Sequence, residues 1–315
     1  MMRTAPHAPV DTFRHEALMY AGDDGFLAGT LPFIRDGVAH GEPVLVVVDR
    51  RKVERLRAEL DGDAEHVEFA DMAAVGANPG RIIAAWRDFV DRHAASGRRL
   101  RGIGEPIDAG RRGAELVECH RHEELLNLAF ADADGFWLVC PYDTEALDPD
   151  VVERAQTTHP LLRHGVASRD SGRYDREAPT APASDPLPEP STAPEELPVA
   201  PGALARARDC VRRHAEAAGL STARRDDLLL AVTEAASNSI RHGGGHGVLR
   251  VWREPDALVC EMRDAGRLDQ PLAGRLPPPH AHGGGYGLWL VNQVCDLVQL
   301  RSFTGGSVVR MHMRV

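Results

Sequence analysis

Hydrophobic positions in the first half of the chain follow two different periods. Five short apolar runs have the length and the β-branched or aromatic content of strands. They cover residues 17–22, 43–49, 66–71, 100–106 and 136–143. Between them, apolar residues recur every three or four positions, as in NPGRIIAAWRDFVDRHAASG, which is typical of amphipathic helices. The run PVLVVVD is apolar throughout and fits a parallel strand covered on both faces. This region is predicted to be a three-layer α/β domain.

The pattern changes in the last third of the chain. Two amphipathic helical stretches come first, at residues 203–220 and 221–243, and Ser221 or Thr222 can cap the second one. Strand-like runs follow, interrupted by a Gly/Pro-rich loop and a short helix near residue 288. These runs cover residues 248–254, 258–264, 298–303 and 307–315. The order predicts an α+β two-layer sandwich, with helices on one face of a mixed, mostly antiparallel sheet.

Residues 171–201 separate the two patterns. Eight of the chain's 22 prolines fall in this segment, together with an acidic excess. Proline removes backbone donors and biases its neighbours toward extended conformations. We therefore predict a semi-stiff disordered linker. It joins a domain at residues 1–170 to a second domain at residues 202–315.

Composition narrows the class of protein. The chain has 315 residues, of which 43% are hydrophobic, so each domain can bury a core of its own. No apolar run reaches the length of about 18 residues that a membrane span needs, and the N-terminus lacks the apolar core of a signal peptide. The five cysteines are scattered and form no C-x-x-C pair. Reduced thiols in a cytoplasmic protein are expected.

The net charge and the lysine content argue against two further kinds of binding site. The net charge of −10 disfavours direct binding of nucleic acid, which requires a basic surface. Lys52 is the only lysine, and it does not stand in a G-x-x-x-x-G-K-[ST] motif. A phosphate-binding loop of that type is therefore absent from the sequence.

Three motifs in the second domain carry candidate chemistry. In TEAASNSIRHGGG, the residues Glu234, Asn238 and His242 recur every fourth position and so form one stripe along the predicted helix. Carboxylate, amide and imidazole groups are costly to bury without partners. Either the stripe faces solvent, or it faces a polar ligand such as a metal-bound polyphosphate.

The other two motifs are short. Asp264 ends a predicted strand and is followed by Gly266, a pattern that suits either an ordinary turn or a carboxylate that accepts a bond from an amine. The run HGGGYGLWLV places glycines directly before a helix that begins near Leu288. Glycines allow close backbone approach, and a helix N-terminus attracts anions, so this run suits phosphates unless it is only a flexible loop.

Taken together and in this order, the three motifs resemble the N, G1 and G2 boxes of the GHKL (Bergerat-fold) ATPases, above all those of the anti-sigma-factor serine kinases. The resemblance covers nearly all of residues 199–315. It implies that ATP and Mg²⁺ bind, with Asn238 on the metal, Asp264 on the adenine amino group, and Glu234 as the base that activates a serine hydroxyl. The implied nucleotide-binding positions are Asn238, His242, Asp264, Gly266, Gly283, Gly284, Gly285, Gly287 and Leu288.

Two departures from the family pattern concern the nucleotide. Arg267 and Leu268 stand where the G1 box often has a second glycine. The lid RLDQPLAGRLPPPHAH is rich in proline, and only His280 and His282 in it could approach a phosphate.

The resemblance also implies partner proteins. They are a sigma factor, which the domain would sequester, and an anti-anti-sigma (STAS-domain) protein, whose serine it would phosphorylate; a homodimer is compatible with it. One alternative is an ATP-gated interaction module without kinase activity, and another is a scaffold whose second domain is only regulatory. A sensor histidine kinase is less favoured. Its phosphoacceptor His-Glu would have to be His15-Glu16 or His122-Glu123, both in the first domain, and the proline-rich linker cannot continue a helical stalk.

The first domain carries a second resemblance. FRHEALMYAG, GEPVLVVVD, HRHEELLNLAF, FWLVCPYD and THPLL resemble the MEDS sensory domain over about residues 13–162. This implies a RecA-like fold without a phosphate loop and the sensing of a small molecule. Since open α/β sheets bind ligands at the carboxyl ends of strands, the candidate sensory pocket consists of His15, Tyr20, Glu105, Cys140, Tyr142 and His159. Cys119 shares a helix face with Glu123 and also with His122, so this helix could supply two ligands of a metal site, unless these residues belong to a hydrogen-bonded core.

Overall fold

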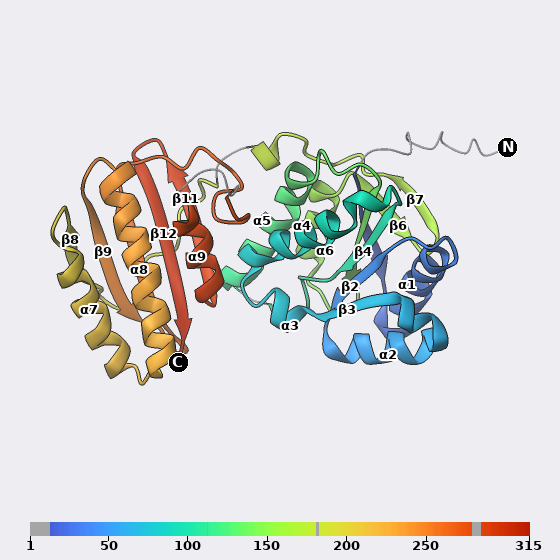
Figure 1. Ribbon diagram of the computed structural model, residues 1–315, viewed down its shortest axis with the longest axis horizontal. Helices are drawn as coiled ribbons and strands as arrows, with labels where there is room; N and C mark the ends of the chain where they lie inside the picture. The colour runs from blue at the N-terminus through green and yellow to red at the C-terminus, as the bar shows by residue number, and fades with distance from the viewer. Residues whose placement is uncertain (1–12, 112, 181–182, 279–284) are drawn as a thin grey trace. The chain divides into compact units, whose positions relative to one another are not determined.

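The computed structural model (Figure 1) divides the chain into two compact units. It describes residues 13–111, 113–180, 183–278 and 285–315. The first unit extends to Pro179, and the second runs from Thr180 to Val315 and also takes in Ala77–Ala84. Among the described residues, no helix is long and apolar enough to cross a membrane.

The first unit is built on a seven-stranded sheet in the order β3-β2-β4-β5-β1-β6-β7. The strands are β1 (Arg14–Tyr20), β2 (Val44–Val48), β3 (Val67–Asp71), β4 (Leu100–Gly104), β5 (Phe136–Asp143), β6 (Leu161–His164) and β7 (Ala167–Asp170). The helices are α1 (Gly22–Ala39), α2 (Arg50–Leu60), α3 (Met72–Val75), α4 (Ile82–His93), α5 (Gly113–Ala129) and α6 (Pro149–Thr158). Neighbouring strands of this sheet run parallel, except β6 and β7, which form an antiparallel hairpin.

Both faces of this sheet are covered. Every residue of β2 is buried, as the apolar run predicts. On one face, Leu18 and Val46 pack in a cluster with Phe33 of α1 and Leu56 of α2. On the other face, Trp86 of α4 lies so close to the sheet that a Cβ at Gly104 would fall 2.8 Å from its ring. The prediction of a three-layer α/β domain is confirmed.

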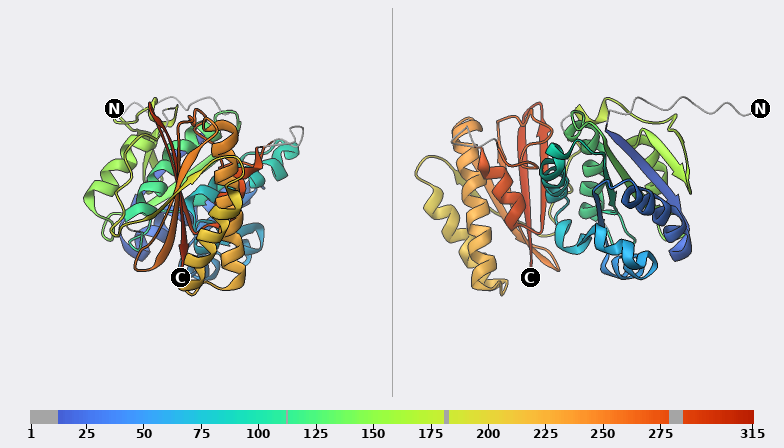
Figure 2. Two further views of the ribbon diagram at one scale, coloured as in Figure 1. Left: turned by 90° about the vertical axis from the view of Figure 1, so that its left-hand side faces the viewer. Right: turned by 45° about the vertical axis from the view of Figure 1, so that its right-hand side comes forward.

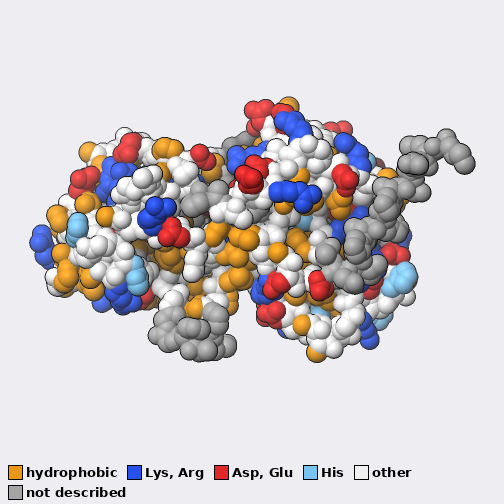
Figure 3. Space-filling model, turned by 90° about the horizontal axis from the view of Figure 1, so that it is seen from above, with side chains coloured by type: hydrophobic (Ala, Val, Ile, Leu, Met, Phe, Trp, Pro, Cys, Tyr) orange, Lys and Arg blue, Asp and Glu red, His pale blue; other side chains and the backbone are white. Residues whose placement is uncertain are grey.

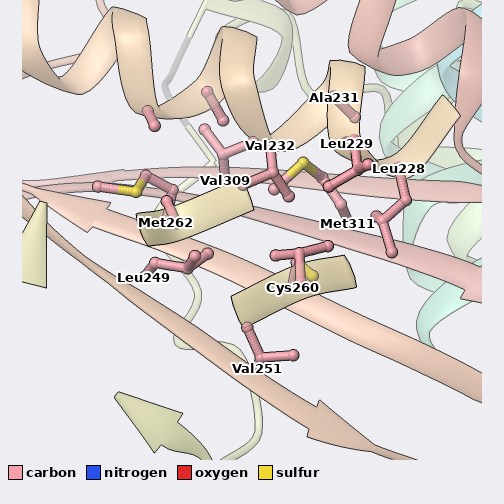
Figure 4. Packing of buried hydrophobic residues seen from close by; sticks show 14 of the residues in the cluster. Leu228, Leu229, Ala231, Val232, Leu249, Val251, Cys260, Met262, Val309 and Met311 are labelled. Carbon is pink, nitrogen blue, oxygen red and sulfur yellow. The ribbon is translucent and has the colours of Figure 1, made fainter. Parts of the chain in front are cut away.

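The second unit is a five-stranded sheet in the order β11-β12-β10-β9-β8 with three helices. The strands are β8 (Glu195–Val199), β9 (Gly247–Arg253), β10 (Ala257–Asp264), β11 (Leu297–Phe303) and β12 (Gly306–Arg314), and the helices are α7 (Leu204–Ala217), α8 (Thr222–His242) and α9 (Tyr286–Val294). The helices lie on one face of the sheet (Figures 1 and 2). Figure 4 shows side chains of α8, such as Leu228 and Val232, packed against Cys260 and Met311 of the sheet. The α+β two-layer prediction is confirmed, although every pair of strands is antiparallel rather than mixed.

The segment at residues 171–201 differs from the predicted linker. Its last part forms β8, which pairs with β9 and includes Pro198. Proline is tolerated there because β8 is an edge strand, where a missing donor faces no neighbour. Upstream of β8, the carbonyl of Ala183 accepts a hydrogen bond from Ser302 N (2.9 Å), and Glu189 pairs with Arg250 (2.9 Å). Much of this segment therefore belongs to the second unit, although its composition resembles that of a free linker.

Charges of both signs are interspersed on one face of the molecule. On the face shown in Figure 3, Lys and Arg side chains alternate with Asp and Glu, and the described residues of that face form no basic stripe.

Candidate functional site

Helix α8 carries the polar stripe of the second unit. Ser221 caps it by accepting a hydrogen bond from Arg224 N (3.3 Å), as predicted. Glu234 and Asn238 are half-buried, and His242 is exposed. Neither the Glu234 carboxylate nor the Asn238 amide hydrogen-bonds to any residue in the described part of the chain. The two side chains lie beside the core face and remain available to a ligand.

The first turn of α9 faces this stripe. Gly285 precedes the helix in a left-handed conformation (φ 98°), which favours glycine. A Cβ at Gly287 would lie 2.9 Å from Glu234 Oε2 and 3.0 Å from Asn238 Nδ2. A side chain there would push the ends of the Glu234 and Asn238 side chains aside, so glycine lets both stay next to the helix backbone. The N-terminus of a nine-residue helix, with its unpaired amides and positive dipole end, therefore lies against Glu234 and Asn238.

The end of β10 meets the C-terminal end of α8. Asp264 Oδ1 accepts hydrogen bonds from Gly266 N (2.8 Å) and Ser307 Oγ (3.0 Å). A Cβ at Gly243 would fall 2.5 Å from Asp264 Cγ, so glycine is needed at this approach as well. Among the described residues, none donates to Asp264 Oδ2, which leaves one carboxylate oxygen for an external donor.

The structure thus gathers the described residues of all three motifs around the C-terminal half of α8. Leu288 lies in the first turn of α9 and packs against the hydrophobic core of the unit. Leu268, where the sequence departs from the G1-box pattern, is hydrogen-bonded to β11. Its backbone N–H donates to Ser302 Oγ (3.0 Å). Gly283, Gly284, His280 and His282 lie outside the described residues.

The predicted sensory residues of the first unit separate into two places, of which one is an open cleft. At the carboxyl ends of the strands, Tyr20 Oη donates to Glu105 Oε1 (2.6 Å), and Lys52 Nζ donates to Glu105 Oε2 (2.6 Å). The cleft encloses about 250 Å³. It is lined by Tyr20, Asp23, Asp49, Arg51, Lys52, Glu105, Ile107, Asp108, Ala109, Asp143, Ala146 and Leu147. Burial raises the pKa of Glu105 to about 7, although the Lys52 ammonium opposes that shift.

The second place is a closed cluster under α5. His15, Cys140, Tyr142 and His159 are all buried there, around the carboxylate of Glu123. Glu123 Oε2 lies 3.3 Å from His15 Nε2 and 3.2 Å from His159 Nε2. Burial, reinforced by the neighbouring His159, lowers the pKa of His15 to about 4, so this imidazole is neutral at neutral pH.

Cys119 and His122, the other metal candidates on α5, lie apart from this group of donors. The Cys119 thiol donates to the carbonyl of Pro106 (3.3 Å), and burial raises its pKa to about 12. The hydrogen-bonded core interpretation therefore describes Cys119. His122 is buried beside Glu123 without joining the donor group.

Comparisons with known families agree with this division of the chain. Residues 14–160 match the MEDS family, the MEthanogen/methylotroph, DcmR Sensory domain. Residues 197–313 match the histidine kinase-like ATPase domain. The chain joins a MEDS domain to a histidine kinase-like ATPase domain. The second match begins within β8, which is consistent with that strand belonging to the ATPase sheet.

Among solved structures, the chain is similar to one described as the RsbU and RsbW domains of Rv1364c from Mycobacterium tuberculosis. The two are 16% identical with a TM-score of 0.30, over 39% of this chain and 32% of the other. The similarity thus spans about a third of the length of that protein. No curated protein matches the chain.

Four contact residues were not among the predicted sites. Lys52 lines the cleft of the MEDS domain, and its being the chain's only lysine was a signal that could have marked it. Glu123 and Asn127 complete the closed cluster. Ser307 holds Asp264 in the ATPase domain. The spacing of Glu123 from Cys119 on one helix was a weak signal for Glu123, whereas no local pattern in the sequence marks Asn127 or Ser307.

The two His-Glu pairs of the MEDS domain do not suit a sensor histidine kinase. His15 and His122 are each only 1% exposed. An imidazole enclosed to that degree cannot meet a nucleotide bound to another domain.

Proposed function

We propose that the ATPase domain binds Mg-ATP at the junction of α8, α9 and the end of β10, and that it phosphorylates a serine of an anti-anti-sigma (STAS-domain) partner. The same domain sequesters a sigma factor in the cytoplasm, and the MEDS domain regulates it. The observation that carries the proposal is the bare backbone of Gly287 against Glu234 and Asn238. That arrangement supplies an anion-binding helix terminus directly beside a carboxylate and an amide.

The residues present fit a magnesium nucleotide. Mg²⁺ prefers oxygen ligands and is usually held by one or two protein groups together with substrate phosphates. The carboxamide oxygen of Asn238 would hold the metal, which neutralises phosphate charge when bound. The chain would do this without a phosphate-loop lysine, since Gly285, Gly287 and Leu288 belong to the N-cap and first turn of α9, where backbone amides have no partner within the helix. His242, exposed at the end of α8 one turn beyond Asn238, is assigned to the phosphate side of the site in this proposal.

The adenine end of the site lies at β10. Asp264 is fixed through Oδ1 by Gly266 and Ser307, so Oδ2 keeps a constant position. A carboxylate oxygen held in this way accepts a hydrogen bond from an exocyclic amine, which distinguishes adenine from guanine at that position.

Glu234 has the position of the general base. Its carboxylate lies beside the α9 terminus, where the γ-phosphate is expected, and is half-exposed to an incoming hydroxyl. In the proposed reaction Glu234 accepts the proton of the partner's serine while the serine oxygen attacks the γ-phosphorus and ADP leaves. The backbone amides position the γ-phosphate and stabilise its negative charge, which further lowers the activation barrier of phosphoryl transfer.

The MEDS domain contributes the proposed sensory pocket. The cleft of Tyr20, Lys52 and Glu105 is open, polar and located at the carboxyl ends of parallel strands, where α/β sheets bind ligands. We assign the small-molecule ligand to this cleft.

One observation favours an ATP-gated interaction module without kinase activity. Residues 267–268 replace a G1-box glycine, and Leu268 is tied to Ser302. Incubation of the full chain with γ-labelled ATP and STAS-domain proteins separates the two functions. Label on a partner serine that Glu234→Gln abolishes supports the kinase. ATP binding without any transfer to a panel of such partners supports the module.

A further inference from the structure

The closed cluster of the MEDS domain brings four different donors together. His15 comes from β1, Glu123 from α5, Cys140 from β5, and His159 from the residue that ends α6. One ligand atom of each lies within 4.8 Å of all the others. None of the four residues is more than 1% exposed. Segments separated by more than a hundred residues thus converge at one point in the core.

The hydrogen bonds around the cluster fix which ring nitrogens face inward. Asn127 Nδ2 donates to the carbonyl of Thr158 (2.8 Å), so its Oδ1 is the atom that accepts from His15 Nδ1 (3.2 Å). His159 Nδ1 lies 2.9 Å from the carbonyl of Ala155, which can only accept. His15 therefore carries its proton on Nδ1 when neutral and directs its Nε2 lone pair toward Glu123. His159 does the same when Thr158 Oγ1, 2.9 Å from its Nδ1, donates to the Ala155 carbonyl (3.2 Å) rather than to the imidazole.

An imidazole lone pair that faces a carboxylate is repelled by it unless a proton or a metal ion lies between them. The Cys140 thiol can donate to His15 Nε2 at 3.3 Å. Among the described residues, however, His159 Nε2 and both Glu123 oxygens have no hydrogen-bond donor, although each is buried. A fully buried carboxylate without a partner is expensive. The cluster therefore requires a cation beside Glu123, either a proton on one of the two Nε2 atoms or a metal ion.

We propose that His15, Glu123, Cys140 and His159 bind a divalent transition-metal ion of the zinc type. Ligand atoms about 2.0–2.3 Å from a tetrahedral ion lie roughly 3.3–3.7 Å apart. The separations of 3.2 and 3.3 Å from Glu123 to the imidazoles and of 3.3 Å from His15 to Cys140 are close to that range.

The donor chemistry agrees with the geometry. Two imidazoles, a carboxylate and a thiolate are a set that zinc accepts. With both the carboxylate and the thiolate ionised, the charge of a divalent ion is cancelled inside the core. Asn127 and the Ala155 carbonyl act as the outer partners that orient ligating histidines in metal sites. Metal binding releases the thiol proton of Cys140 to solvent as the domain folds.

Metal analysis of the full-length chain tests this proposal. Protein produced in zinc-supplemented medium without a polyhistidine tag is expected to retain about one zinc per chain by elemental mass spectrometry. Because the site is closed, chelator should remove the ion only after denaturation. Retention of less than a tenth of an equivalent, together with no uptake on refolding in zinc, would overturn the proposal.

Cobalt substitution identifies the ligands. The protein refolded with Co²⁺ should show visible d–d bands and a sulfur-to-cobalt charge-transfer band. Cys140→Ser should lose the charge-transfer band and bind the metal at least tenfold more weakly. Cys119→Ser is the matched control, because Cys119 is equally buried and bonds only to Pro106 O. A charge-transfer band that survives in Cys140→Ser contradicts the assignment, and the wild-type spectrum remains decisive if a variant fails to fold.

Discussion

Helices α8 and α5 both carry acidic and other polar side chains next to a hydrophobic core. They differ in how the carboxylate on each helix is stabilised. On α8, Glu234 is half-buried and has no partner among the residues that the structure describes. On α5, Glu123 is fully buried, with two imidazoles within 3.3 Å. Because water reaches the α8 stripe, the free-energy cost of desolvating its side chains is small. A ligand can therefore bind there and dissociate. The α5 cluster has no such access and needs a permanent counter-charge.

The largest expected effect concerns chemistry at α8. Glu234→Gln should reduce phosphotransfer to the STAS-domain partner by about 10²–10⁴-fold, the contribution of a general base. Affinity for Mg-ATP should change less than about threefold and stability by less than about 0.5 kcal/mol, because the side chain is partly solvated and unpaired. Label transfer and calorimetry on the same samples measure both. Undiminished transfer removes Glu234 from the catalytic role.

The corresponding change on α5 should act on stability instead. Glu123→Gln removes the buried carboxylate that balances the charge of the proposed metal ion, so the unfolding free energy of the MEDS domain should fall by about 3–5 kcal/mol. Hydrogen exchange of β1 and β5 amides in the full chain reports this. The matched control is Glu145→Gln, because Glu145 is an exposed glutamate of the same domain. Equal stability of the two variants would show that α5 and α8 do not differ in the way described.

Glu105, in the open cleft of the MEDS domain, is buried like Glu123 but has hydrogen-bond partners. Its effect on stability should depend on pH. The pKa of Glu105 is raised from 4.5 to about 7 by burial, so the folded domain binds this proton more tightly than the unfolded chain does. The contribution of Glu105 to stability should therefore be fully present below about pH 4.5 and should fall by up to about 3 kcal/mol as pH rises through 7. Glu105→Gln should abolish that slope. A slope that persists in the variant assigns it to another group.

The smallest expected effect concerns backbone access at α9. Gly287→Ala places a methyl group 2.9 Å from Glu234 Oε2, and we expect about a tenfold loss of ATP affinity, or about 1.4 kcal/mol. Gly305→Ala is the control, since nothing lies within 4 Å of a Cβ there. Equal affinity in the two variants means that the N-terminus of α9 does not approach the phosphates.

Sequence patterns predicted regular elements well where burial was uniform. The run at residues 136–143 coincides with β5, and Ser221 caps α8, because a fully apolar strand and a capped helix are locally determined. Strand β8 was missed because Pro198 and its acidic neighbours resemble a linker, whereas an edge strand tolerates them. The hairpin of β6 and β7 was missed because each strand has only four residues.

The sites were predictable to different degrees for the same reason. The α8 stripe and the glycines of α9 could be read from spacing, since each lies within one element or its flank. The closed cluster depends on contacts between β1, α5, β5 and the end of α6, which no local pattern specifies. Its histidines and Cys140 were predicted as pocket residues, but the central Glu123 was not.

Calorimetric titration of the full-length chain with ATP in the presence of Mg²⁺ tests the nucleotide site most directly. The wild-type protein should bind one ATP per chain only with Mg²⁺ present, and Asn238→Ala should weaken that binding by more than about tenfold, or 1.4 kcal/mol. Ser237→Ala, its neighbour on α8, should bind as the wild type does. ATP binding that is absent from the wild type, or unchanged in Asn238→Ala, would contradict the site at α8, α9 and β10.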